Sequence, residues 1–244
     1  MSQKRKKEEK SGGNFLEKAL WSVYAVFYDD MTRFYAPYRR LLKRISGIIR
    51  LNASKKNTVV LDAGCGTGEF SVEMAKNGWS VYAFDNSAAM LGIFRRKAAG
   101  LKNINIKNAD LEKSFPYKNG FFDIVLNVHS LFMLRDFKKV LSGFDRVLKR
   151  GGILVIAHNR PVNLMSLCGK EFAENGIKGV IVNGARLFGA GVINMIISIV
   201  HRRVYNTIPA GEITGFLMKK GYRLLILEKA YRDVDDLIVM RKKR

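Results

Sequence analysis

The residues that decide the fold run from Val59 to Phe70 and read VVLDAGCGTGEF. The apolar start, bounded by glycines, predicts a buried strand, and the residues after Gly68 predict a helix. Glycines at the turn between them let the backbone adopt unusual dihedral angles and approach a ligand closely. The helix directs its free N–H groups and the positive end of its dipole at that ligand. The stretch therefore predicts a cofactor-binding strand–loop–helix unit.

The rest of the chain repeats the alternation of strand and helix. Strands are expected over residues 59–61, 80–84, 104–106, 122–128, 153–157, 222–229 and 237–240. Helices are expected over residues 69–77, 88–99, 136–148 and 212–220. This alternation predicts an α/β fold, with a doubly wound, mostly parallel seven-stranded sheet that carries helices on both faces.

Three segments lie outside this alternation. Residues 1–13 form a charged tail that ends in glycines, and we expect it to be disordered. Residues 14–50 predict an N-terminal helical cap, whose second helix starts at Pro37. Residues 161–206 predict a helical insert or lid after the fifth strand. We expect residues 14–244 to form a single domain.

Charge is the outlying feature of the composition, because 43 basic and 21 acidic residues give a net charge of +22. Such a surplus favours anionic partners such as nucleic acid, anionic lipid or acidic protein; a basic surface kept for solubility is the alternative. The insert has apolar residues near helical spacing, such as Ile177 and Ile181, with basic residues such as Lys170 beside them. This pattern predicts contact with a membrane interface or, equally, a lid packed on the domain.

The cysteines and the N-terminus bear on location. Cys65 and Cys168 lack the spacing of metal ligands, so we expect no metal site and a reducing, cytoplasmic setting, with peripheral membrane contact as a further option. The basic run from Lys4 to Lys7 is not followed by an apolar segment, which argues against a secretory signal. No uninterrupted apolar run reaches the roughly 18 to 20 residues that span a bilayer.

The glycine spacing is Gly-x-Gly-x-Gly. It differs from the Gly-x-Gly-x-x-Gly of dinucleotide-binding folds and lacks the Gly-Lys-Ser/Thr of a P-loop. Asp85 ends the second strand, where a carboxylate is well placed to accept hydrogen bonds from ribose hydroxyls. The alternative, a cap for the following helix, suits Ser87 better. Asp110 follows the third strand and either caps a turn or accepts from an adenine amino group.

At these residues the chain resembles class I S-adenosylmethionine (SAM)-dependent methyltransferases. Five segments match the motifs of that family in order: residues 60–68, 84–91, 108–111, 122–127 and 146–154. The resemblance covers roughly residues 55 to 158 and implies a Rossmann-like methyltransferase fold with SAM as cofactor. The cofactor-binding residues that it implies are Asp62, Gly64, Cys65, Gly66, Gly68, Asp85, Asn86, Met90, Asp110, Leu111 and Asn127.

Within that superfamily the core is most similar to small-molecule methyltransferases of ubiquinone and menaquinone biosynthesis. There an aromatic residue near the N-terminus closes over the cofactor, which makes Tyr28 and Tyr35 lid candidates. Packing of both rings in the core is the alternative. The segment Asn127-Val128-His129-Ser130 differs from the asparagine-proline-proline-tyrosine motif, which argues against methylation of DNA adenine or glutamine.

The resemblance implies methyl transfer from a sulfonium, for which the protein mainly positions and desolvates the reactants. His129, after the fourth strand, is the first candidate for a catalytic base, and His158 is the second; a structural histidine in a loop is the alternative. The acceptor predicted first is a hydrophobic or lipid-like small molecule. RNA or a ribosomal component is the alternative that the charge favours, and a non-catalytic SAM-binding partner protein is a third.

Overall fold

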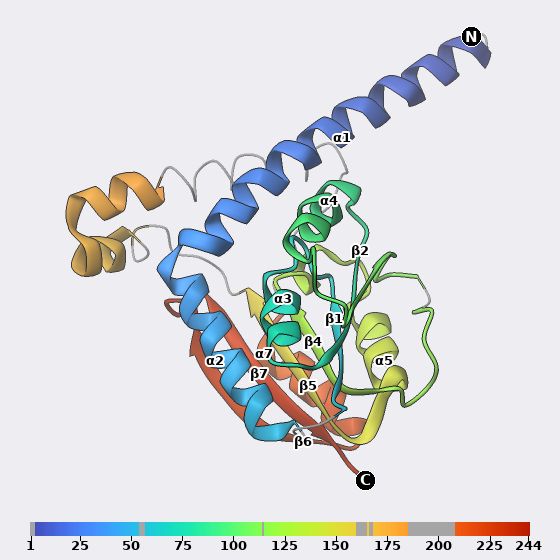
Figure 1. Ribbon diagram of the computed structural model, residues 1–244, viewed down its shortest axis with the longest axis vertical. Coiled ribbons are helices and arrows are strands. Elements are labelled where there is room, and N and C mark those ends of the chain that lie inside the picture. The colour runs from blue at the N-terminus through green and yellow to red at the C-terminus, as the bar shows by residue number, and fades with distance from the viewer. Residues whose placement is uncertain (1–2, 54–56, 114, 160–164, 166–167, 185–207) are drawn as a thin grey trace.

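The computed structural model describes residues 3–53, 57–113, 115–159, 165, 168–184 and 208–244, with side chains from residue 19 onward. Its centre is a seven-stranded sheet with the strand order β3-β2-β1-β4-β5-β7-β6 (Figure 1). The strands are β1 (Val59–Ala63), β2 (Ser80–Asp85), β3 (Ile104–Asn108), β4 (Phe122–Val128), β5 (Leu148–Asn159), β6 (Tyr222–Ala230) and β7 (Asp235–Lys242). The predicted mostly parallel α/β sheet is confirmed: β1 to β5 pair in parallel, and β7 is antiparallel to β5 and β6.

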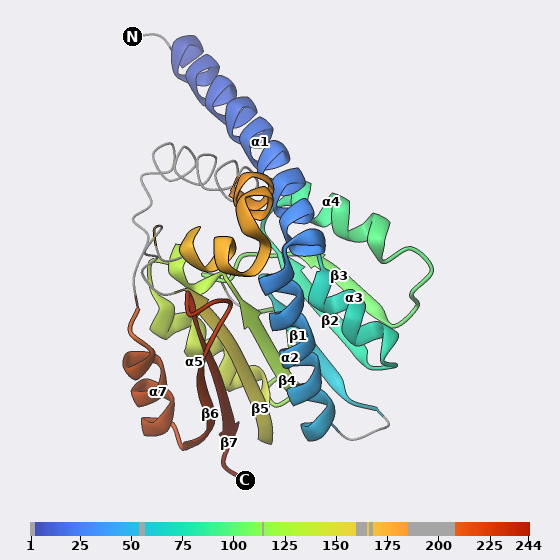
Figure 2. The ribbon, with the colours of Figure 1, turned by 90° about the vertical axis from the view of Figure 1, so that its left-hand side faces the viewer.

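Helices cover both faces of the sheet (Figure 2). They are α1 (Gln3–Phe34), α2 (Ala36–Asn52), α3 (Glu69–Lys76), α4 (Ala88–Lys97), α5 (Phe137–Val147) and α7 (Ala210–Lys219), with the short 3-10 helix η1 (Leu131–Met133). Successive strand residues point to opposite faces. Val60 therefore packs in one apolar cluster with residues of α2 and α3, and Leu61 packs in another with residues of α5 and α7. These two layers fix the loop that follows β1.

The N-terminal segment differs from its prediction. Residues 3–13, for which we expected disorder, are the first part of the 32-residue helix α1. Lysine, arginine, glutamine and glutamate have high helix propensity, so a charged sequence of this kind can extend a helix that is anchored further along. Pro37 lies in the first turn of α2, as predicted. The two helices meet at Tyr35.

The fifth strand and the insert can also be compared with their predicted bounds. β5 spans Leu148–Asn159 instead of 153–157, because its two ends also pair with Phe122 of β4 and Asp235 of β7. In the insert, residues 168–184 are helical and are here called the insert helix, within which Gly176 has a φ of +63°. The rest of the predicted insert, apart from residue 165, lies outside the described residues.

Candidate active site

The glycine loop connects β1 to α3 and is held by backbone hydrogen bonds to the next strand. The N–H groups of Gly64 and Cys65 both donate to the carbonyl oxygen of Phe84, at 2.9 and 3.0 Å. All three loop glycines have positive φ angles, between +53° and +79°. A Cβ on Gly64 would lie 2.9 Å from the Ser130 Oγ. The loop therefore needs glycine for its backbone angles and, at Gly64, for its clearance.

Asp85 lies at the C-terminal end of β2 beside this loop. Its Oδ2 accepts from the N–H of Gly66 at 3.0 Å, and its Oδ1 accepts from the N–H of Ser87 at 2.8 Å. Burial raises the pKa of the Asp85 carboxyl, while these backbone bonds lower it. Ser87 caps α4 by accepting from Met90 N–H, as its position predicted. Asp85 is thus left free of the capping role.

A pocket opens beside the loop at the C-terminal ends of the strands. Its lining combines the glycine loop, the ends of β2 and β4, and aromatic residues of α1. The lining residues are Trp21, Tyr24, Tyr28, Gly64, Gly66, Asp85, Asn86, Met90, Ala109, Asp110, Leu111, Glu112, Val128, His129, Ser130, Met133 and Leu134. Nine of the residues that the sequence proposed for the site or for its lid are among them.

Four proposed cofactor residues lie outside this lining, namely Asp62, Cys65, Gly68 and Asn127. Asp62 is buried beneath the loop, where it accepts from Ser71 Oγ at 2.6 Å. Burial raises its pKa to about 7, against the lowering effect of the Ser71 bond. Asn127 is also buried and donates to the Ala63 carbonyl at 2.7 Å. Both side chains support the loop from below.

Gly68 and Tyr35 do not line the pocket, because each packs against another part of the protein. A Cβ on Gly68 would lie 2.0 Å from Phe94 Cδ2, so this glycine allows α3 and α4 to approach each other. Tyr35 is buried and packs edge-on against Tyr231, at 5.6 Å between ring centroids. The core position that was the alternative for Tyr35 is therefore the one observed. His158, the second base candidate, is buried and does not line the pocket.

The sequence predicted only Tyr28 of the pocket wall that α1 forms. Trp21, Tyr24 and Tyr28 follow each other at helical spacing, so they share one face of α1. Tyr28 lies over the loop, because a Cβ on Gly66 would be 3.2 Å from its ring. The helical spacing of Trp21 and Tyr24 is the signal that could have placed them in the pocket wall. The same spacing of aromatic residues also fits a helix face that is buried in the core.

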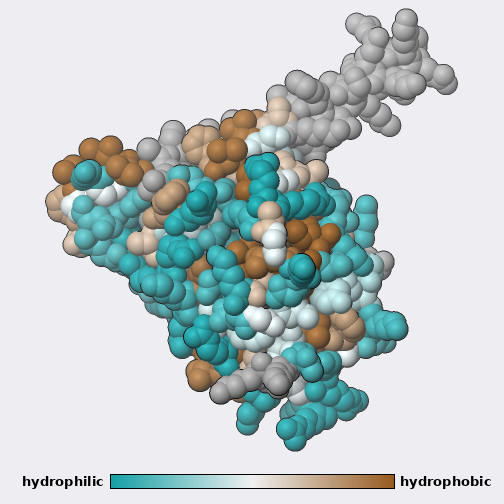
Figure 3. Space-filling model, viewed as in Figure 1, coloured by the Kyte–Doolittle hydropathy of each residue, from teal (hydrophilic) through white to brown (hydrophobic). Residues whose placement is uncertain are grey.

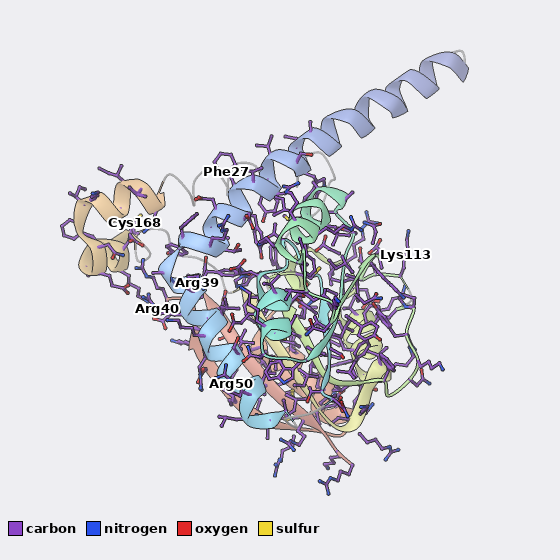
Figure 4. All side chains as sticks on the ribbon, viewed as in Figure 1. Phe27, Arg39, Arg40, Arg50, Lys113 and Cys168 are labelled. Atoms are coloured by element: carbon purple, nitrogen blue, oxygen red, sulfur yellow. The ribbon has the colours of Figure 1, made fainter. Side chains whose placement is uncertain are left out.

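Ion pairs hold α1 against the core next to the loop. The ammonium of Lys97, at the end of α4, lies 2.5 Å from Asp29 and 2.9 Å from Glu69. Arg39 reaches Glu69 from α2 at 2.8 Å, and Figure 4 labels it at the junction with α1. These mostly buried charges join α1, α2, α3 and α4 around one point. They position Tyr28 over the glycine loop.

His129 stands at the end of β4 on the pocket wall. Its Nε2 is 2.6 Å from Oδ2 of Asp235, the first residue of β7. The backbone of His129 has a φ of +53°, in a region that residues other than glycine rarely adopt. Tyr38 and Tyr231 pack against its ring, at centroid distances of 6.0 and 5.3 Å. Nothing local in the sequence marks Asp235, because the strand pairing that brings it here joins distant segments.

The residues around the pocket fit an adenosyl sulfonium such as SAM. Each oxygen of Asp85 accepts one backbone bond and keeps a lone pair for a ribose hydroxyl. Tyr28 and Trp21 line the pocket, and the face of an aromatic ring attracts a cation. Asp110 uses Oδ1 to accept from Glu112 N–H at 2.9 Å, which is the turn-capping alternative, and it also lines the pocket.

Comparisons with known proteins agree with this geometry. Residues 61–156 match a family model described as a methyltransferase domain. The chain is 31% identical over 104 residues to demethylmenaquinone methyltransferase of Staphylococcus aureus (strain JH9), covering 41% of this chain and 43% of the relative. It is 30% identical over 143 residues to carboxy-S-adenosyl-L-methionine synthase of Campylobacter hominis, covering 54% and 58%. Residues 61–156 thus carry the methyltransferase domain that this family model describes.

A solved structure shows the same fold. Magnesium protoporphyrin IX methyltransferase of Synechocystis PCC 6803, with bound SAM, aligns with a TM-score of 0.59 at 15% identity over 85% of this chain and 80% of that one. The matches span about half the length of the curated relatives, and one of these is named a synthase. The comparisons thus identify a methyltransferase domain, and its cofactor and reaction have to be argued from the pocket.

Two further features concern metals and membranes. In the part of the chain that the structure describes, no group of three or more His, Cys, Asp or Glu side chains could hold a metal ion. Within the same residues, no helix offers a stretch that is long and apolar enough to cross a bilayer.

Proposed function

We propose that this methyltransferase transfers the methyl group of SAM to a hydrophobic or lipid-like small molecule at an anionic membrane surface. The observation that carries this proposal is the composition of the pocket. Its lining combines the glycine loop and Asp85, which suit the cofactor, with apolar and aromatic residues such as Tyr24, Met133 and Leu134. An acceptor that contacts these apolar residues must itself be largely apolar.

The proposed roles of the site residues follow from their places. Gly64, Gly66, Asp85, Asn86, Met90, Asp110 and Leu111 are proposed to hold SAM, with Tyr28 covering it. Asp62, Cys65, Gly68 and Asn127 are proposed to support the loop. SAM supplies a methyl group on a sulfonium, which is an excellent leaving group, so positioning and exclusion of water dominate catalysis. The name of the Staphylococcus aureus relative, demethylmenaquinone methyltransferase, supports a quinone-like acceptor.

The distribution of exposed apolar side chains supports contact with a membrane. Twelve large apolar side chains are exposed in the described part of the chain, and nine of them lie on α1 or in the insert. These nine are Val23, Val26, Phe27, Phe34, Met165, Phe172, Ile177, Ile181 and Val182. Figure 3 shows apolar surface over both segments, and α1 also forms a wall of the pocket.

The charge of the protein also supports a membrane as the partner. Arg33 and Lys178 are exposed among these apolar residues, and the whole chain carries a net charge of +22. Apolar side chains with basic neighbours suit the boundary between lipid headgroups and acyl chains. The proposed location is therefore the cytoplasm, with peripheral contact to an anionic membrane through α1 and the insert.

Labelled methyl transfer tests the proposed reaction. SAM with a radioactive methyl group is incubated with the protein and a cell extract, which is then separated into lipid, RNA and protein fractions. The proposal expects label in the lipid fraction. Label confined to the RNA fraction would replace it with an RNA methyltransferase, and SAM binding without any transfer would favour a non-catalytic binding protein.

Flotation with vesicles tests the membrane contact. We expect the full chain to float with vesicles of phosphatidylcholine and phosphatidylglycerol, and the double variant Phe27→Asp/Ile177→Asp to lose most of this binding. The matched control, Met218→Asp/Leu227→Asp, changes two apolar side chains of comparable exposure that lie on neither α1 nor the insert, and it should float like wild type. Equal flotation of both variants would contradict the proposed surface.

A further inference from the structure

Asp235 is a fully buried carboxylate whose only ion-pair partner among the described residues is His129. Its Oδ2 lies 2.6 Å from Nε2 of the imidazole. Its other oxygen, Oδ1, is also buried and has no hydrogen-bond partner in the described part of the chain. No lysine or arginine of that part pairs with it. His129 is therefore the described residue whose side chain contacts the Asp235 carboxylate.

A buried carboxylate without a counter-ion is costly, and a protonated imidazole beside it removes most of that cost. The arrangement therefore stabilises the positive charge that His129 acquires when it accepts a proton. A general base needs this stabilisation at the moment of proton transfer. An acceptor that already offers a free lone pair, such as a thioether, would make no use of it.

The ring of His129 is also fixed in orientation. Tyr38 of α2 and Tyr231, in the turn between β6 and β7, pack against it. Its left-handed backbone conformation is an additional strain that the surrounding contacts maintain. Because Nε2 faces Asp235, Nδ1 is the nitrogen that remains for a group in the pocket, which His129 lines.

We propose that Asp235 is the positioning residue for His129 and that the acceptor is a hydroxylated molecule. Its hydroxyl proton passes to Nδ1 of His129, and the electron pair left on the acceptor forms the bond to the methyl carbon. SAM, when bound, supplies that methyl group, and the electron pair of the broken methyl–sulfur bond stays on sulfur. This inference rests on the proposed function and narrows the substrate class of the same site.

Nitrogen NMR of the full chain tests the dyad without an acceptor. The sequence has three histidines, so the variants His129→Gln and His158→Gln assign every imidazole. We expect wild-type His129 to carry its proton on Nε2 and to have a bare Nδ1. In Asp235→Asn the amide N–H can donate to Nε2, so the imidazole proton should move to Nδ1. A wild-type proton on Nδ1 would overturn the proposal.

Kinetic measurements then distinguish a positioning role of Asp235 from a merely structural one. Asp235→Asn and His129→Gln should each lower methyl transfer into a lipid extract by about 100-fold or more, and the double variant should lose no more than either. The SAM dissociation constant should stay within about twofold in calorimetry, since neither side chain is proposed to hold SAM. An unchanged rate in either variant would overturn the dyad. Absence of SAM binding to wild type would instead refute the proposed function and leave the NMR result standing.

Discussion

The carboxylate of Asp85 accepts a hydrogen bond from the backbone N–H of Gly66, with 3.0 Å between Oδ2 and the nitrogen. This bond joins the end of β2 to the glycine loop after β1. It fixes the loop in the shape that its positive φ angles require, and it aims the carboxylate at the pocket. One residue therefore both shapes the proposed cofactor site and offers its charge to the ligand.

Gly68 should tolerate a side chain far less well than Gly78. Both have φ angles near +80°, but a Cβ on Gly68 would lie 2.0 Å from Phe94, whereas nothing lies within 4 Å of one on Gly78. We expect Gly78→Ala to lower the free energy of unfolding by about 1 to 2 kcal/mol, from backbone strain alone. Gly68→Ala should cost a further 1 to 3 kcal/mol or so, from overpacking. Urea denaturation measures both, and equal losses would contradict the packing described.

The titration of the Asp62 carboxyl should lower the free energy of unfolding as pH rises. Its folded-state pKa of about 7 is above the ordinary value of 3.8, so the folded protein keeps a proton that the unfolded chain has lost. The contribution of this proton to the free energy of unfolding is therefore fully present below about pH 4. It is lost as pH rises through about 7, and the loss reaches about 4 kcal/mol at most.

The variant Asp62→Asn cannot titrate and should lose this dependence. Relative to wild type, its free energy of unfolding in urea should improve between pH 5 and pH 8. Ser71→Ala is the matched variant, because it removes the hydrogen bond that lowers the Asp62 pKa. It should be more destabilising at pH 8 than at pH 5. Identical pH dependence in wild type and Asp62→Asn would show that the buried carboxyl does not behave as described.

Arg232 should hold the insert helix in place. Its buried guanidinium pairs with Glu171, also buried, and with Glu174 at 2.8 Å. Arg40 extends from α2 to the same Glu174 at 3.0 Å, and Figure 4 labels it on the side of α2 that faces the insert. Removing Arg232 leaves the Glu171 carboxylate buried without its cation, which typically costs 3 to 5 kcal/mol or so.

Hydrogen exchange can localise this effect. Arg232→Met should accelerate amide exchange across residues 168–184 strongly. Arg44→Met removes an exposed ion pair with Glu228, which should be worth less than about 1 kcal/mol and should leave exchange in the insert helix unchanged. If both variants exchange like wild type, the insert helix is held by other contacts.

Much of the site could be predicted because its signals are local. The glycine loop, Asp85 and the Ser87 cap all lie within the β1-to-α4 segment, where spacing alone places them at the strand ends. The sheet followed from the same alternation. The seven strands appear in the predicted order along the chain.

The remaining features depend on tertiary structure. The sequence does not tell on which side of the loop a side chain lies. In the structure Asp62 and Asn127 are buried beneath the loop, and their assignment to the cofactor stays a prediction. Asp235 reaches His129 only because β7 inserts antiparallel between β5 and β6. The left-handed conformation of His129 has no signature in its residue type.

Calorimetry of SAM binding tests the central claim most directly. Wild type should bind SAM, and Asp85→Ala should weaken binding by about 1 to 2 kcal/mol, or about 5- to 30-fold, since it removes charge-assisted hydrogen bonds. Glu228→Ala, which changes an exposed carboxylate outside the pocket lining, should bind like wild type. Equal affinity of Asp85→Ala and wild type, or no binding by either, would contradict the account.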